Sequence, residues 1–347
     1  MSRKKRYYPQ FLIKWINFEF WPSWIFYAPM FLYGFVLAIK SRSFAYFTAA
    51  NPGMAFGGAY GTDKTKLLNL LSSKYHTKDF FVAKGKTKDE IIKLMNENEI
   101  DFPIVAKPNV GERGRGVEKI DNILELDNYL NIIKEELIIQ EFVAHPIEIG
   151  IFYHRFPNSS QDGISSVVLK EFLSITGNGR DTFGKLVSRN FRAQSRLKYF
   201  KKRYINKWNI IVPDGITFKV EPIGNHSRGT KFLDGNHLIN KDLVNVFRNI
   251  CIPLEGFYYG RFDIKVNSIR DLYEGENIKV LEINGTNSEP AHIYDPDYSL
   301  FNAYREVVKH MNIVYRISRA NIALGIKPVP FLDLIKGLLH HLFGEKK

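Results

Sequence analysis

Two acidic side chains and one amide in the C-terminal half of the chain have the spacing of a cation site. The segments 260–266 (GRFDIKV) and 279–285 (KVLEING) have the alternation of strands. Asp263 lies on the first segment, and Glu282 and Asn284 share one face of the second, because alternate strand residues point the same way. Oxygen ligands of this kind suit Mg²⁺. The pattern predicts one or two Mg²⁺ ions, with Mn²⁺ as a substitute, although the same acids also suit the exposed face of a hairpin.

Arg261 precedes Asp263 by two positions, so it shares the same face of the predicted strand. A guanidinium group in that position is suited to stabilise charge on a transferring phosphoryl group or on an acyl-phosphate oxygen. We therefore predict that Arg261 is a catalytic residue.

A lysine followed by three glycines forms the second informative stretch, 103–120 (PIVAKPNVGERGRGVEKI). A strand presents Lys107, and the following turn contains Gly111, Gly114 and Gly116. Glycines allow backbone N–H groups to approach phosphate oxygens, and the lysine adds a positive charge. The stretch predicts a polyphosphate site, although it is neither a P-loop nor a dinucleotide fingerprint. A plain glycine-rich hairpin is the alternative.

The third stretch, 138–152 (IIQEFVAHPIEIGIF), places a carboxylate at the start of a strand, after a proline-containing turn. Glu148 in that position is suited to accept hydrogen bonds from both ribose hydroxyls. The backbone of Glu141, Phe142 and Val143 is suited to contact an adenine edge. The alternative is that Glu148 is an ordinary charge on an edge strand.

Candidate substrate contacts lie in two turn-rich segments, 224–232 and 288–295. His226, Arg228 and His292 are the side chains we select, and Arg228 is suited to bind a carboxylate through two parallel hydrogen bonds. A solvated arginine is the alternative. The one cysteine, Cys251, excludes an intramolecular disulfide and a cysteine-rich metal site, and we expect it to be a buried packing residue.

The positive charge of the chain is concentrated in two stretches. Residues 1–14 and 189–207 contain five and eight basic side chains and no acidic one, and together they equal the net charge of +13. The remainder is balanced, so no nucleic-acid partner is expected. The second stretch predicts either the mouth of an anion site, a surface for acidic lipids, or a solvated helix face.

The residues from Phe20 to Ile39 include no charged side chain, and a run of about 20 residues is long enough to cross a bilayer. Pro22 and Pro29 interrupt the run and basic residues flank both ends, which favours a segment that dips into a membrane and returns. The alternatives are an aromatic hairpin packed on the protein core and a cleaved signal peptide. Residues 331–343 have the period of an amphipathic helix, which either packs on a domain or lies on a membrane.

The body of the chain alternates strand and helix patterns, and strands predominate, which predicts an α+β fold with mixed or antiparallel sheets. We divide the chain into a membrane-associated segment 1–60, a main domain 61–325 with subdomains of about 85–165 and 166–325, and a C-terminal helix 326–347. Helices are expected at 64–72, 86–99, 238–250 and 300–324. Strands are expected at 102–108, 136–143, 147–156, 164–175, 215–224, 260–269 and 277–285, with a turn at 271–277.

The three stretches occur in the order and separation of the ATP-grasp superfamily, and residues 62–325 most resemble its carboxylate–amine ligases, such as D-alanine–D-alanine ligase. The resemblance implies two α+β subdomains that clasp ATP, behind a shortened N-terminal region. It implies the following roles. Lys107 and Lys170 contact the nucleotide, Glu141 to Val143 form the adenine hinge, Glu148 holds the ribose, Asp263, Glu282 and Asn284 bind Mg²⁺, and Arg261 stabilises the transition state.

Two departures distinguish the chain from the dipeptide ligases of this family. The N-terminal domain of the family is replaced by the aromatic segment, and GTNSEPAHIYDP at 285–296 replaces the motif of the dipeptide ligases. The reaction implied is ATP-dependent amide formation from a small carboxylate and a small amine, through an acyl phosphate, at the cytoplasmic side of a membrane. A kinase-like phosphotransferase and a non-catalytic nucleotide-binding membrane adaptor are the alternatives.

Overall fold

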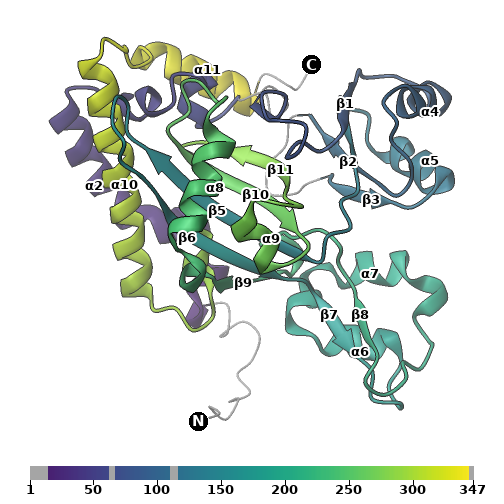
Figure 1. Ribbon diagram of the computed structural model, residues 1–347. Helices are drawn as coiled ribbons and strands as arrows, with labels where there is room; N and C mark the ends of the chain where they lie inside the picture. The colour runs from purple at the N-terminus through teal and green to yellow at the C-terminus, as the bar shows by residue number, and fades with distance from the viewer. Residues whose placement is uncertain (1–14, 62–66, 110–115, 344–347) are drawn as a thin grey trace.

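The computed structural model describes residues 15–61, 67–109 and 116–343, and it is built around two antiparallel sheets (Figure 1). The smaller sheet has the order β1-β4-β2-β3. Its strands are β1 (Asp79–Val82), β2 (Ile104–Pro108), β3 (Glu118–Ile120) and β4 (Leu137–Glu141). Helices α4 (Lys88–Glu97) and α5 (Ile123–Ile132) bury apolar side chains against this sheet, and a Thr87–Glu90 capping box begins α4.

The larger sheet has five strands in the order β11-β10-β5-β6-β9, and every neighbouring pair is antiparallel. Its strands are β5 (Ile147–Arg155), β6 (Asp162–Glu171), β9 (Lys231–Asp234), β10 (Tyr259–Val266) and β11 (Lys279–Asn284). Alternate residues such as Ile149, Ile151, Phe262 and Ile264 form the core with α8 (Lys241–Cys251) and α9 (Ile269–Glu274).

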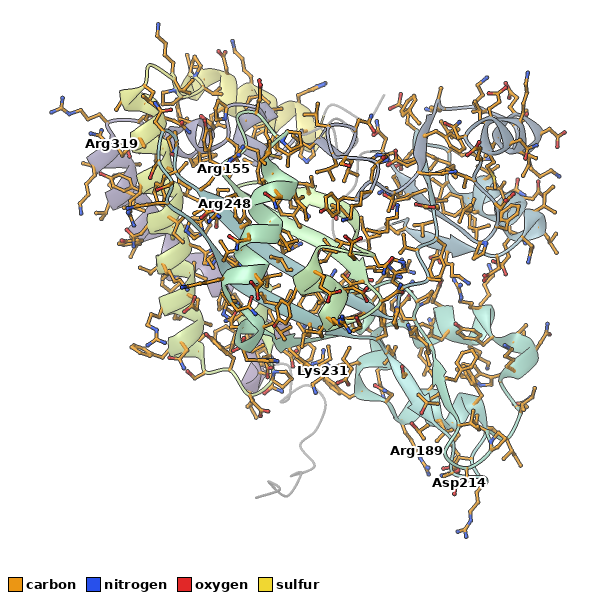
Figure 2. The ribbon with its side chains drawn as sticks, in the orientation of Figure 1. Arg155, Arg189, Asp214, Lys231, Arg248 and Arg319 are labelled. Atoms are coloured by element: carbon orange, nitrogen blue, oxygen red, sulfur yellow. The ribbon has the colours of Figure 1, made fainter. Side chains whose placement is uncertain are left out.

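A third unit lies beside the two sheets, at the lower right of Figure 1. It contains the two-stranded sheet β7 (Ser174–Thr176) and β8 (Thr217–Lys219) with helices α6 (Phe183–Arg189) and α7 (Leu197–Arg203). Phe183, Val187 and Phe200 form its own small core. The basic stretch therefore belongs to a packed unit, and the exposed side chain of Arg189 projects from its outer end (Figure 2).

Two helices, α2 (Ser23–Ser41) and α10 (Leu300–Ala323), pack together beside the larger sheet, at the left of Figure 1. The expectation that residues 20–39 dip and return is corrected: α2 is one continuous helix that begins after Pro22 and includes Pro29. Its 19 residues are long and apolar enough to cross a bilayer, and only 17% of its most apolar window is buried. Helix α11 (Phe331–Phe343) is the expected amphipathic C-terminal helix.

The α+β class is confirmed, and the sheets are antiparallel. Six of the seven expected strand segments each contain one strand, and 164–175 contains parts of both β6 and β7, which are separated by Phe172 and Leu173. The turn expected at 271–277 is wrong, because the connection between β10 and β11 includes the helix α9. The helix expected at 64–72 falls partly outside the described residues. Strands β1 and β9 and helix α5 were not expected. Helix α7 lies in the basic stretch 189–207, for which a helix face was one of the alternatives.

Candidate active site

A cleft of about 1370 Å³ lies between the two sheets, and most of the predicted site residues line it. Alternate residues of the larger sheet that point away from the α8 side face this cleft, because side chains of a strand alternate between its faces. Those residues are Glu148 from β5, Val168 and Lys170 from β6, Arg261, Asp263 and Lys265 from β10, and Glu282 and Asn284 from β11.

The three predicted metal ligands are neighbours across one strand pair. In the register of β10 and β11, Asp263 lies directly opposite Glu282 and Arg261 lies opposite Asn284. The Asn284 side-chain amide donates to Asp263 Oδ2 over 3.3 Å, and Arg261 Nη2 donates to the same oxygen over 3.1 Å. Asp263 is thus the counter-ion of a guanidinium as well as a candidate ligand. Among the described residues, no group of three or more His, Cys, Asp or Glu side chains is arranged for a metal ion.

Lys170 joins the two acidic parts of the site. Its Nζ lies 2.8 Å from Glu148 Oε1 and 3.0 Å from Asp263 Oδ1, and all three side chains are buried. Burial alone would lower the pKa of Lys170, but the two carboxylates outweigh burial and raise it. Burial would likewise raise the pKa of Asp263, but Arg261 and Lys170 lower it to about 2. The cluster therefore holds separated charges inside the protein at neutral pH.

The predicted adenine hinge connects the two sheets, since it runs from the end of β4 to the start of β5. Glu141, Phe142 and Val143 all line the cleft. Lys265, which sequence reasoning missed, donates from Nζ to the Val143 carbonyl over 2.8 Å, and its Nζ lies 4.7 Å from the centre of the Phe142 ring. Lys265 lies opposite Glu148 in the β10–β5 register, so a strand-pairing prediction is the signal that would have found it.

Lys107 reaches the cleft from the smaller sheet, where its Nζ donates to Gln140 Oε1 over 3.2 Å. Gly111 and Gly114 lie outside the described residues. Gly116 has a φ of 72°, and a Cβ added there would lie 2.7 Å from Pro108 Cγ, so the turn requires glycine at this position. The cleft thus receives one lysine, Lys107, from the smaller sheet, and two lysines, an arginine and carboxylates from the larger sheet.

The predicted substrate contacts separate into one that lines the cleft and two that do not. His226 lines it. Arg228 is 4% exposed. Its guanidinium lies 3.1 Å from a carboxylate oxygen of Glu221, which follows β8, and 3.2 Å from a carboxylate oxygen of Glu118 in β3. His292 is fully buried and forms a hydrogen bond with the Ser166 hydroxyl. Neither Arg228 nor His292 is among the residues that line the cleft, so their contacts support a structural role.

Several cleft residues were not selected from the sequence. Glu19, from η1 (Phe18–Phe20), and Arg192, from η4 (Phe191–Arg196), form an ion pair of 2.7 Å in the cleft wall. Of the basic stretch 189–207, Arg192 is the only charged side chain among the described cleft-lining residues. Cys251 is buried, as expected, and burial raises the pKa of its thiol.

No protein-family model and no curated protein matches the chain. Solved structures that are similar to it include a bifunctional glutathione synthetase from Pasteurella multocida, at 12% identity over 74% of this chain and 38% of that one, with a TM-score of 0.37. VanG D-Ala:D-Ser ligase from Enterococcus faecalis is similar at 13% identity over 75% and 61%, with a TM-score of 0.41. D-alanine–D-alanine ligase from Bacillus anthracis complexed with ATP is similar at 15% identity over 75% and 68%, with a TM-score of 0.40.

This chain spans less than two thirds of the length of the first two of these structures. The solved structures that it is similar to include the kind of ligase that the sequence motifs resemble.

Proposed function

We propose that this protein is an ATP-dependent carboxylate–amine ligase of the ATP-grasp kind. The observation that carries the proposal is the meeting of Lys107 from the smaller sheet with Lys170, Arg261 and Asp263 from the larger sheet in one cleft. A polyphosphate needs positive charge on both sides, and a cleft between two sheets supplies it.

The nucleotide would lie between the hinge and the lysines. The hinge residues 141–143 face the adenine, with Lys265 fixing the Val143 carbonyl. Glu148 lies at the start of β5, where its carboxylate is suited to accept the ribose hydroxyls. Lys107 and Lys170 would contact the phosphates, and Lys170 would then exchange part of its contact with Asp263 for a phosphate oxygen.

The residues present fit Mg²⁺ by the chemistry of their donors, since Asp263, Glu282 and Asn284 offer oxygens from adjacent, paired strands. Two carboxylates and one amide leave ligand positions for phosphate oxygens and water. When bound, the ion would neutralise charge on the β- and γ-phosphates. Mn²⁺ suits the same donors.

The reaction we propose has two displacement steps. A substrate carboxylate oxygen attacks the γ-phosphorus, forming a P–O bond while the bond to the bridging oxygen breaks and ADP leaves. The substrate amine then attacks the acyl carbon, the C–N bond forms, and phosphate leaves with the bonding electron pair. Arg261 lies beside Asp263, one of the proposed Mg²⁺ ligands, and is suited to stabilise the charge that develops on the phosphoryl oxygens. The proton that the amine loses passes to solvent or to the released phosphate.

A phosphotransferase or a nucleotide-binding adaptor would use the same nucleotide residues, so the test must distinguish the three. Purified protein is incubated with ATP and Mg²⁺ and with pools of carboxylates, amines and cell-envelope precursors. A ligase releases ADP and phosphate only when a carboxylate and an amine are both present, and mass spectrometry detects a new amide. ADP release with a hydroxyl acceptor and no amine would establish a phosphotransferase. ATP binding without turnover would favour the adaptor.

We also propose that one face of the protein lies on the cytoplasmic surface of a membrane. Exposed apolar side chains of α2 continue through Phe44 to the start of α11, since the Phe44 ring lies 5.9 Å from that of Phe35 and 5.6 Å from that of Phe331. We call this the α2–α11 face. Its members are Phe31, Leu32, Phe35, Ile39, Phe44, Phe331 and Leu332, each at least half exposed. An exposed apolar area of this kind, with Lys40 and Arg42 at the end of α2, suits an anionic lipid surface.

A further inference from the structure

A buried carboxylate from the N-terminal segment occupies one end of the cleft. The Glu19 side chain is 5% exposed, and its Oε2 accepts a hydrogen bond from Arg192 Nη2 over 2.7 Å. His226 Nε2, from η6 (His226–Arg228), lies 3.1 Å from the same oxygen. Glu19 is 173 residues from Arg192 and 207 from His226 along the chain, so three separate segments meet at this carboxylate.

Glu19 satisfies only part of what Arg192 offers. Nη1 of Arg192 is buried and has no hydrogen-bond partner among the described residues. A guanidinium group presents parallel N–H donors that match both oxygens of one carboxylate. One oxygen of Glu19 makes the contacts with both Arg192 and His226. Arg192 and His226 could therefore bind a carboxylate that uses both of its oxygens, which Glu19 does not do. A buried donor without an acceptor is costly, which favours such an exchange.

Aromatic rings surround the cluster and connect it to the centre of the cleft. The Arg192 guanidinium lies 5.4 Å from the centre of the Phe20 ring, and the His226 ring lies 5.3 Å from that of Phe232. The Lys170 ammonium lies 6.0 Å from the centre of the same Phe232 ring. Apolar walls exclude water and strengthen ionic contacts. Phe232 therefore lies near both this cluster and Lys170 of the proposed phosphate site.

We infer that Arg192 and His226 form a binding subsite for a carboxylate of the substrate, and that Glu19 occupies this subsite when substrate is absent. If the proposed ligase function holds, one of the two substrates keeps a free carboxylate away from the reacting centre, as an amino acid or a dicarboxylic acid does. A simple amine or a simple monocarboxylic acid cannot occupy both the reacting centre and the Arg192–His226 subsite.

Succinate is the probe for this subsite, and its binding is measured by isothermal titration calorimetry on the full chain without nucleotide. Replacement of Glu19 by glutamine removes the competing charge, so Glu19→Gln is expected to bind succinate at least about tenfold more tightly than the unaltered protein. The double variant Glu19→Gln/Arg192→Gln is expected to lose this gain. Glu276→Gln is the matched control, because it removes an exposed carboxylate paired with Lys74 and should change nothing.

Equal succinate affinity of Glu19→Gln and the unaltered protein would overturn the inference, as would a gain that survives loss of Arg192. If Glu19→Gln increases the affinity for inorganic phosphate at equal ionic strength as much as it increases the affinity for succinate, the assignment to a carboxylate is wrong. Glu19→Asp, which keeps the charge on a shorter side chain, is the second variant if Glu19→Gln does not fold, and its affinity is expected to lie between the two. Stabilisation by ATP and Mg²⁺ is recorded separately, so failure of nucleotide binding and failure of the subsite give different results.

Discussion

Gly224 lies against the carboxylate of Glu148 so closely that a Cβ on Gly224 would be 2.2 Å from Glu148 Oε1. Gly224 does not have a positive φ, so its role is to leave space and not to permit a special backbone conformation. The absence of a side chain at position 224 therefore allows Glu148 to stay in its contact with Lys170.

Gly224→Ala tests whether the position of Glu148 matters for nucleotide binding. The added methyl group is expected to push the carboxylate away from Lys170 and into the proposed ribose site, which should weaken ATP binding about tenfold, the effect of about 1.4 kcal/mol. The measurement is the ATP-dependent rise in melting temperature across a concentration series. Gly163→Ala is the control, since a Cβ there meets His154 at an ordinary distance of 3.4 Å. Unchanged ATP affinity in Gly224→Ala would count against Glu148 as the ribose contact.

Substitutions of Asp263 and Glu282 are expected to have the same effect on ATP turnover but different effects on stability. The comparison distinguishes a role in metal binding from a role in neutralising Lys170 and Arg261. Both Asp263→Asn and Glu282→Gln should abolish ATP turnover, because each removes a proposed Mg²⁺ ligand. Asp263→Asn should also destabilise the fold by about 3 kcal/mol, because it leaves the buried Lys170 and Arg261 with less negative charge. Glu282 is less buried, so its loss should cost less stability.

The two measurements are denaturant unfolding and ADP release with and without Mg²⁺. Removal of the metal by EDTA should stop turnover in the unaltered protein and leave its unfolding free energy without ATP unchanged. Full turnover in either variant would exclude the metal assignment. Equal unfolding free energies for Asp263→Asn and the unaltered protein would show that Asp263 does not balance the two cations.

Local patterns predicted the centre of the site, because its residues follow the two-residue period of strands. Arg261, Asp263, Glu282 and Asn284 share one face of β10 and β11 for that reason. The ends of the cleft were not predictable in this way. The contact between Glu19 and Arg192 joins segments far apart in the chain, and no periodicity encodes it.

The sequence also failed to show that Arg192 lines the cleft and Arg228 does not. Arg228 lies between two residues, Ser227 and Gly229, that do line it, yet the Arg228 side chain turns toward Glu221 and Glu118. The direction of a side chain in a short 3-10 turn depends on which carboxylates the rest of the fold brings near. Helix α2 was ambiguous for a related reason, since composition alone does not say which of its sides packs on α10.

Arg228→Gln distinguishes a structural role of this arginine from the clamp that the sequence suggested. The Glu221 carboxylate is nearly fully buried, and among the described residues it would keep only Arg196 as an ionic partner. A loss of about 3 kcal/mol in unfolding free energy is therefore expected. Substrate affinity per folded molecule should change little. Arg196→Gln, which removes the other partner of Glu221, should give a loss of similar size. A normal melting temperature combined with a large rise in KM would instead support the clamp.

Aspartate substitutions on the exposed side of α2 test the proposed membrane surface. Phe31 and Leu32 are 68% and 75% exposed, so the double variant Phe31→Asp/Leu32→Asp should fold normally. Burial of a large apolar side chain contributes about 1.5–3 kcal/mol, so loss of two of them should reduce binding to vesicles of mixed neutral and anionic lipids by at least about tenfold. Flotation of the protein with the vesicles is the measurement. Ile132→Asp is the control, because Ile132 is 71% exposed at the end of α5, outside the α2–α11 face. If the double variant and the control float equally with the vesicles, the α2–α11 face does not bind lipid and the proposed membrane contact is wrong.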